Sequence, residues 1–283
     1  MQSIFSIDVE DWYNISAVGV EPDVSTWDGL PTCVDKDFPR LLELFAEQGI
    51  KVTCFFLGYF ARRFPFLVTE AARQGHEISS HGFYHRLVYQ QTADAFYEDA
   101  LAARKLLQDI SGQPVLGYRA AAFSVNQDTP WFFDRLAQAG YAYDSSVFPA
   151  PHEIGGMSTE RLEPHRISTA HGTLTEFPIT AVRILGKPMC FFGGGYLRLF
   201  PYPLIRTMGR RALAEGRPVL FYIHPREINP GHPRLPMGLK RRFKTYVNLR
   251  TVESKLRSIA RDFELTTYAD WIARNPLREA TPA

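Results

Sequence analysis

Ser3-Ile4-Phe5-Ser6-Ile7-Asp8-Val9-Glu10-Asp11 is the stretch of sequence that decides the fold. Its first half is short, apolar and β-branched, and its second half becomes abruptly acidic. That pattern is typical of a buried strand in a parallel sheet. We therefore expect this strand to deliver Asp8, Glu10 and Asp11 at its carboxyl end.

Further strands and helices alternate along the rest of the chain. Strands are predicted at 51–57, 76–80, 115–118, 141–143, 218–223 and 263–266, and helices at 38–48, 65–74, 94–110, 130–139, 202–215, 251–262 and 268–274. This alternation calls for parallel pairing with right-handed crossovers. About seven strands in one α/β domain favour a barrel over an open sheet. Residues 148–198 show little periodicity and are expected to form an extended loop, and residues 275–283 a loose tail.

Composition limits the classes of function. The formal net charge of +2 is too small to imply nucleic acid as a partner. Cys33, Cys54 and Cys190 are far apart and no CxxC occurs, so neither a thiolate zinc site nor a disulfide framework is indicated, and a reducing compartment is favoured. With no signal-peptide pattern and no apolar run of about 18 residues, the sequence predicts a cytoplasmic protein without a transmembrane segment.

Polar residues follow the predicted strands at the points where those strands end. In an α/β barrel, active sites lie at this end of the strands. The residues in question are Asp8, Glu10, Asp11, His81, His85, Arg119, Asp144 and His224.

His81-Gly82-Phe83-Tyr84-His85 is the sharpest local motif. Two imidazoles four residues apart can bind one ion if the segment makes a helical turn, although two unrelated surface histidines would have the same spacing. Together with one carboxylate they would leave a coordination position open for water, as in a catalytic site. We expect a divalent metal, zinc first, with cobalt or nickel as substitutes.

A hydrolase also needs a base for the water and an acid for the leaving group. Asp8 and His224 are the natural pair, because each ends a buried strand. Arg119 can pair with a carboxylate and keep it ionised, and Asp144 can orient His224. Ordinary strand-end ion pairs would explain Arg119 and Asp144 equally well.

Five ordered motifs resemble those of the NodB-like polysaccharide deacetylases (carbohydrate esterase family 4). They are Ile7-Asp8-Val9-Glu10-Asp11, His81 to His85, Gly117 to Phe123, Tyr143-Asp144-Ser145-Ser146 and Tyr222-Ile223-His224-Pro225. The resemblance implies a distorted (β/α) barrel of about seven strands in a single domain over 1–274, with the motifs in residues 4–225 and a family extension over 226–274. It implies Asp8 as base, His224 as acid, His81 and His85 as metal ligands, Arg119 and Asp144 as supporting residues, and an oxyanion-binding N–H near Ala122.

Two departures from the family pattern matter. The carboxylates read Asp-Val-Glu-Asp, so the third metal ligand is Glu10 or Asp11. Strand alternation favours Glu10, whereas a bend before Trp12 would bring Asp11 inward, and we lean slightly towards Asp11. The proline of the family's arginine motif is Ala121 here, which can loosen the oxyanion loop.

The resemblance implies N-deacetylation of a glycan that contains N-acetylhexosamine. The stretches 192–198 and 243–249 resemble the branch of the family associated with exopolysaccharide and exosortase gene clusters. An amidohydrolase acting on a small cyclic amide and an inactive carbohydrate-binding relative are the alternatives. A basic stretch (Arg234, Lys240, Arg241, Arg242, Lys244 and Arg250) would suit an anionic glycan, a lipid-diphosphate carrier or a membrane surface, although a solvated face explains it as well.

Overall fold

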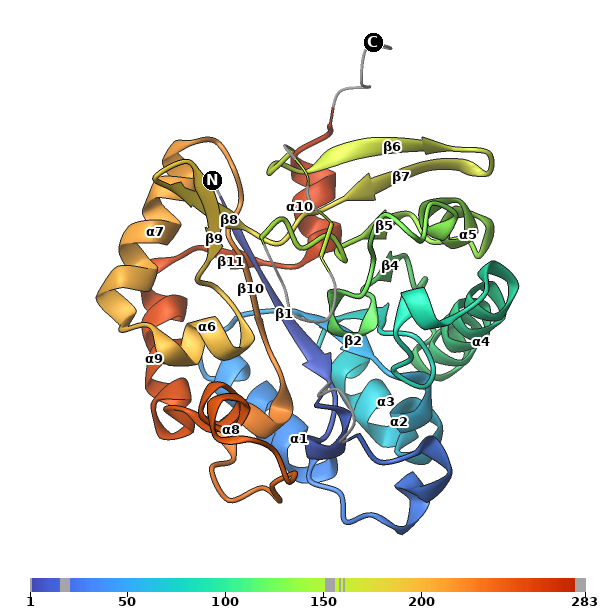
Figure 1. The fold of residues 1–283 in the computed structure, drawn as a ribbon, viewed down its shortest axis with the longest axis horizontal. Helices are drawn as coiled ribbons and strands as arrows, with labels where there is room; N and C mark the ends of the chain where they lie inside the picture. Colours follow the sequence, from blue (N-terminus) through green and yellow to red (C-terminus); the bar gives the residue numbers. More distant parts are fainter. Residues whose placement is uncertain (1, 16–20, 151–155, 158, 160, 278–283) are drawn as a thin grey trace.

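A largely parallel sheet runs through the molecule in the computed structural model, which describes residues 2–15, 21–150, 156–157, 159 and 161–277 (Figure 1). The strands are β1 Ser3–Val9, β2 Thr53–Phe56, β3 Glu77–Ser80, β4 Gly117–Tyr118, β5 Tyr143–Asp144, β6 His165–Thr169, β7 Gly172–Glu176, β8 Ala181–Ile184, β9 Lys187–Cys190, β10 Leu220–Ile223 and β11 Leu265–Thr266. The helices are α1 Val34–Ala46, α2 Gly58–Arg63, α3 Pro65–Arg73, α4 Ala93–Ser111, α5 Phe132–Gln138, α6 Gly194–Leu199, α7 Tyr202–Ala214, α8 Leu239–Tyr246, α9 Val252–Asp262 and α10 Tyr268–Arg274.

Within the described residues, the main sheet has the order β10-β1-β2-β3-β4-β5-β7-β6, with β11 also beside β1. The pairs from β10 to β7 are parallel, and the β6–β7 hairpin is antiparallel. Thr180, just after β7, bridges towards β10: its hydroxyl donates to Pro218 O at 3.0 Å and accepts from Leu220 N at 2.9 Å. The predicted distorted barrel is confirmed, and Thr180 links its two ends.

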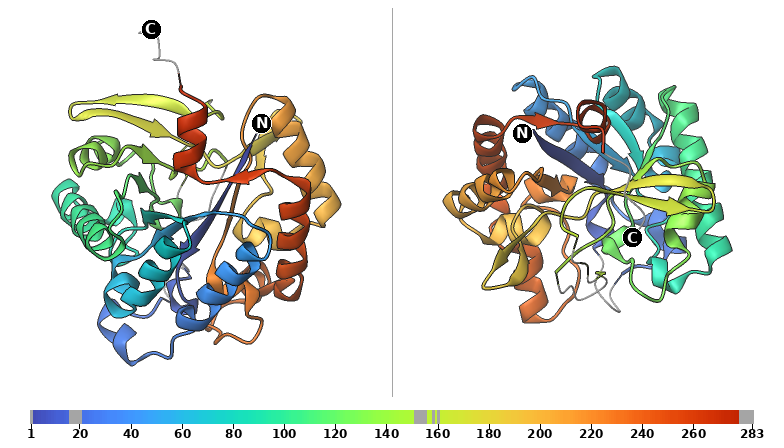
Figure 2. Two further views of the ribbon diagram at one scale, coloured as in Figure 1. Left: turned by 180° about the vertical axis from the view of Figure 1, so that it is seen from behind. Right: turned by 90° about the horizontal axis from the view of Figure 1, so that it is seen from above.

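The strands are buried because helices cover the sheet. All seven residues of β1 are buried, as its apolar sequence predicts. On the outside, α1 packs Phe38 edge-on against Phe56 of β2 at 5.2 Å between ring centroids. Figures 1 and 2 place α7 and α9 on one flank of the sheet and α4 and α5 on the other. None of the described helices is long and apolar enough to cross a membrane.

The expectation of one extended loop over 148–198 is wrong in part. This stretch contains the hairpins β6–β7 and β8–β9, and α6 begins at the second residue of the Gly193-Gly194-Gly195 run. Leu185 and Gly186 both have positive φ (50° and 80°), which suits the two-residue turn of β8–β9. β6 and β7 escaped prediction because Ile167 and Leu174 are their only large apolar residues, and β8 and β9 because each is only four residues long. The predicted loose tail lies outside the described residues from 278 onwards.

Candidate metal and catalytic site

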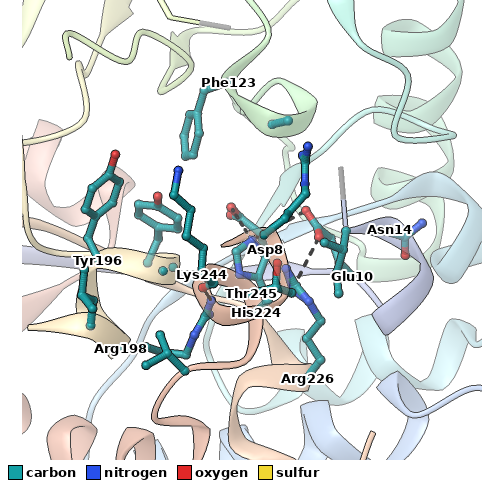
Figure 3. A pocket seen from close by; sticks show the side chains of 18 of the residues that line it. Asp8, Glu10, Asn14, Phe123, Tyr196, Arg198, His224, Arg226, Lys244 and Thr245 are labelled. Atoms are coloured by element: carbon teal, nitrogen blue, oxygen red, sulfur yellow. Dashed lines mark hydrogen bonds and ion pairs between the residues drawn. The ribbon is translucent and has the colours of Figure 1, made fainter. Parts of the chain in front are cut away.

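The strand register brings the candidate residues to one edge of the sheet. Val9 pairs with Phe56, Phe56 with Ser80, and Ser80 with Tyr118. The next residue on β1, β3 and β4 is therefore Glu10, His81 and Arg119 respectively. Ile7 pairs with Ile223, so Asp8 and His224, the next residues on β1 and after β10, lie beside each other at the same edge of the sheet. Asp8, Glu10, His81 and His224 line a pocket of about 450 Å³ together with His85 (Figure 3), and Arg119 lies buried behind Asp8.

Glu10, His81 and His85 form what we call the Glu-His-His cluster. Oε1 of Glu10 lies 3.0 Å from Nε2 of His81 and 2.9 Å from Nε2 of His85, and the three atoms lie within 4.8 Å of one another. Although burial by itself raises the pKa of a carboxyl group, His85 and His224 hold the pKa of Glu10 well below its usual value. Glu10 thus offers an ionised carboxylate to a cation.

The hydrogen bonds of the two histidines favour a cation in this cluster. Nδ1 of His81 lies 2.7 Å from Arg119 O, and because a carbonyl can only accept, Nδ1 carries the hydrogen. In the neutral ring, Nε2 then presents a lone pair to the carboxylate, which is repulsive unless a cation lies between them. Nε2 of His85 is buried and lies 2.9 Å from Glu10 Oε1 without the alignment of a hydrogen bond, and it has no other partner among the described residues. The donor set therefore fits a divalent metal.

The segment that carries both histidines is not helical. Gly82 and His85 have positive φ (77° and 54°), and Asp99 Oδ2 accepts from Phe83 N at 2.7 Å. An irregular turn, rather than the expected helical one, brings the two imidazoles to 5.2 Å between ring centroids.

Asp11 lies outside the Glu-His-His cluster, contrary to our slight preference for it. Its carboxylate accepts from Trp12 N at 2.7 Å, Cys33 N at 2.7 Å and Val34 N at 3.1 Å. Asp11 is the N-cap of the 3-10 helix Trp12–Asn14, and its side chain turns towards these amides. Strand alternation, which favours Glu10, is the better guide here.

Asp8 is held by a fully buried arginine. Arg119 NH1 lies 2.6 Å from Asp8 Oδ1 and also donates to Ser6 Oγ, while NH2 donates to Tyr268 OH at 2.8 Å. The guanidinium stacks 4.2 Å from the centroid of Phe55. These contacts fix one carboxylate oxygen and leave Oδ2 facing His224.

His224 faces the cluster with one ring nitrogen and a carboxylate with the other. Nε2 lies 3.9 Å from Asp8 Oδ2 and 3.8 Å from Glu10 Oε1. Burial first, and then the charge of Arg226, lowers the pKa of His224. Nδ1 of His224 lies 3.5 Å from Oε1 of Glu227, and the negative charge of this carboxylate favours the protonated imidazole. Glu227 is itself ion-paired with Arg198.

Glu227 thus takes the place predicted for Asp144. The contacts of Asp144 are with Ser146, whose hydroxyl donates at 2.6 Å and whose N–H donates at 3.0 Å, and with Glu176. Burial raises the pKa of Asp144 to about 6, and burial together with Asp144 raises that of Glu176. The pair therefore shares a proton and supports the loop after β5. The sequence signal for Glu227 is its position three residues after His224, in the 3-10 helix Pro225–Ile228.

The wall of the pocket comes partly from elements that the sequence did not predict. Tyr196 and Arg198 of α6 and Arg241, Phe243 and Lys244 of α8 line it. On the other side lies Ala122, which has φ 50°, and before it Ala120 has φ −72° and ψ 139°.

Comparisons with known proteins agree with this architecture. Residues 22–143 match the polysaccharide deacetylase family, and residues 145–273 match a domain of unknown function, DUF3473. The chain is 28% identical over 109 residues to a peptidoglycan deacetylase of Helicobacter pylori (38% of this chain, 36% of that protein). It is 26% identical over 103 residues to a peptidoglycan-N-acetylglucosamine deacetylase of Bacillus cereus (36% and 46%). The matched segment thus spans less than half the length of either relative.

Solved structures show the same fold over nearly the whole chain. A candidate polysaccharide deacetylase of Mycobacterium smegmatis superposes with a TM-score of 0.61 at 19% identity, covering 100% of this chain and 95% of that one. An allantoinase superposes with a TM-score of 0.62 at 17% identity, covering 97% and 91%. At such identities the likeness concerns the fold alone.

Proposed function

Because the chain belongs to the NodB-like polysaccharide deacetylase family, we propose that it is a metal-dependent hydrolase that removes acetyl groups from N-acetylated sugars. The observation that carries the proposal is the meeting of the Glu-His-His cluster with Asp8 and His224 in one pocket. A binding protein would have no need of a metal site, a base and an acid side by side.

The Glu-His-His cluster would hold the ion, with zinc as the first candidate and cobalt or nickel as substitutes, since nitrogen and oxygen donors suit all three. When bound, a divalent ion polarises the acetamide carbonyl and lowers the pKa of a water to about 7.

The remaining steps belong to side chains of the chain. Asp8 accepts a proton from the attacking water, and Arg119 holds its other oxygen in place. Ala122 borders the pocket, and its N–H is a candidate donor to the carbonyl oxygen. The carbon–nitrogen bond then breaks as His224 donates a proton to the departing nitrogen, which yields acetate and a free amine.

The substrate we propose is a glycan that contains N-acetylhexosamine, either a polysaccharide or its lipid-linked precursor. Aromatic side chains of Phe123, Tyr196, Tyr222 and Phe243 line the pocket and suit the apolar faces of sugar rings. Residues 192–198 and 243–249, the two stretches that resemble the exopolysaccharide-associated branch of the family, contribute to the wall of the pocket, so we include a role in exopolysaccharide assembly in the proposal. The cysteines are all unpaired, in keeping with a cytoplasmic location.

The test measures acetate released from an N-acetylglucosamine oligomer, with and without a chelator, alongside the metal content of the protein. We expect chelation to abolish release and zinc to restore it. Asp8→Asn should keep the metal and lose the rate by about 10²-fold or more. Full activity of Asp8→Asn would refute the base, and hydrolysis of a cyclic amide without acetate release would refute the sugar substrate.

A further inference from the structure

Helix α8 carries a stripe of apolar side chains whose exposure increases from the C-terminal end of the helix to its N-terminal end. Tyr246, Phe243 and Leu239 are spaced three and four residues apart, so they share one face of the helix. Tyr246 is 8% exposed and its hydroxyl accepts from Leu235 N at 2.9 Å, whereas Phe243 is 59% exposed and Leu239 84%. Leu199, at the end of the neighbouring α6, is 43% exposed. Exposed large apolar side chains gathered in this way mark an interaction surface.

The same segment is strongly basic. Residues 228–252 contain no aspartate or glutamate, and among them are Arg234, Lys240, Arg241, Arg242, Lys244 and Arg250. Lys240 and Arg242 are exposed on either side of the apolar stripe. A short helix with exposed apolar residues flanked by cations is the pattern of a helix that lies in a membrane interface.

Helix α8 is fixed to the pocket. Lys244 O accepts from Arg198 NH2 at 3.0 Å, and Arg198 O accepts from Asn248 Nδ2 at 3.2 Å. Phe243 and Lys244 line the pocket itself, and in Figure 3 the Lys244 side chain extends from α8 towards Phe123. Whatever α8 binds is therefore brought to the mouth of the catalytic pocket.

We propose that α8 docks the protein onto an anionic lipid bilayer, with Leu239 inserted among the headgroups and the flanking cations on lipid phosphates, while Phe243 stays at the mouth of the pocket. A soluble polyanion would satisfy the cations but leave the apolar stripe in water, which is why the bilayer is the better partner. Docking would place the pocket where a lipid-linked glycan is presented. The inference goes beyond the deacetylase activity, because binding to a bilayer requires no turnover.

The test is flotation of the full chain with vesicles of equal parts phosphatidylglycerol and phosphatidylcholine, compared with pure phosphatidylcholine. We expect binding to the anionic vesicles that weakens as salt is raised. Leu239→Ser should lower the partition coefficient about tenfold and Lys240→Glu at least about fivefold, in line with the burial of one leucine and the loss of one cation. The matched controls are Leu185→Ser in the β8–β9 turn, where the leucine is 99% exposed, and Lys105→Glu on α4; both should bind as the parent does.

Three outcomes would overturn the proposal: absence of flotation with the anionic vesicles, equal losses in Leu185→Ser and Leu239→Ser, or binding to soluble heparin as tight as to vesicles and unchanged in Leu239→Ser. Acetate release from a soluble oligomer should be the same in Leu239→Ser as in the parent, because Leu239 does not line the pocket. A failure of acetate release in the parent would refute the proposed function and leave the flotation result intact.

Discussion

Replacing Glu10 and Asp11 separately by their amides should affect two different properties: Glu10→Gln should weaken metal binding, and Asp11→Asn should lower the free energy of unfolding. In Glu10→Gln the cluster loses its charged oxygen, which lies 3.0 and 2.9 Å from the two imidazoles. Loss of groups that merely support metal ligands typically costs 10–100-fold in affinity, so loss of a ligand should cost about 100-fold or more. The side chain stays isosteric, so we expect the metal-free protein to unfold at nearly the same denaturant concentration as the parent.

Asp11→Asn should do the reverse. The Asp11 carboxylate accepts three backbone N–H groups, and an amide in its place must turn its NH₂ towards at least one of them. A buried donor without an acceptor costs about 1–3 kcal/mol, and the loss of charge weakens the bonds that remain, so we expect about 2–4 kcal/mol of lost unfolding free energy. The metal should stay bound.

Urea unfolding of the metal-free proteins and zinc titration of the folded ones give the two readouts. The reasoning fails if Asp11→Asn loses the metal while Glu10→Gln keeps it. Equal loss of metal in both variants, at unchanged stability, would mean that both carboxylates bind the ion.

Three further predictions concern other parts of the chain. Replacing His224 by alanine should lower kcat by about 10²–10⁴-fold at unchanged metal content, whereas Glu227→Gln should lower kcat less and shift its pH profile to lower pH, as steady-state kinetics would reveal. Ala121→Pro should keep the fold and preserve or raise acetate release, because the preceding residue already has the φ and ψ that a proline requires, and a misfolded variant in circular dichroism would contradict this. Burial, with the charge of Lys51 second, lowers the pKa of His76 to about 4, so between about pH 6.5 and 4 the native state binds fewer protons than the unfolded chain and becomes less stable as the pH falls. Chemical unfolding should show a loss of about 2–3 kcal/mol of unfolding free energy between pH 7 and pH 4.5. The loss should be smaller in His76→Asn, whose amide oxygen can still accept from Val52 N as Nδ1 does.

The longest parallel strands were predictable because they are rich in apolar residues. Leu220–Ile223 is apolar or aromatic throughout, and in Ser3–Val9 only Ser3, Ser6 and Asp8 are polar. The carboxyl ends of parallel strands lie at the same edge of the sheet, so the residues that follow these strands are brought to one side of the molecule. The β6–β7 hairpin was not predictable in the same way, since only Leu174 and Glu176 of these two strands are buried, and the pairing of polar strands leaves little trace in hydropathy.

Side chains after a strand end are harder to place than those within it, because the next turn decides where they point. Glu10 follows the alternation of β1, but one residue later a 3-10 helix redirects Asp11 to backbone amides. The same limit explains the partner of His224. The order of the motifs along the chain predicts Asp144 as the carboxylate that supports His224. In the structure, Asp144 contacts Ser146 and Glu176 instead, and the turn after β10 brings Glu227 close to the imidazole. An acid three residues beyond a strand-ending histidine can reach its ring through a single helical turn, whereas one from another strand depends on the register of the whole sheet. Local geometry is therefore the stronger reason to assign the support of His224 to Glu227.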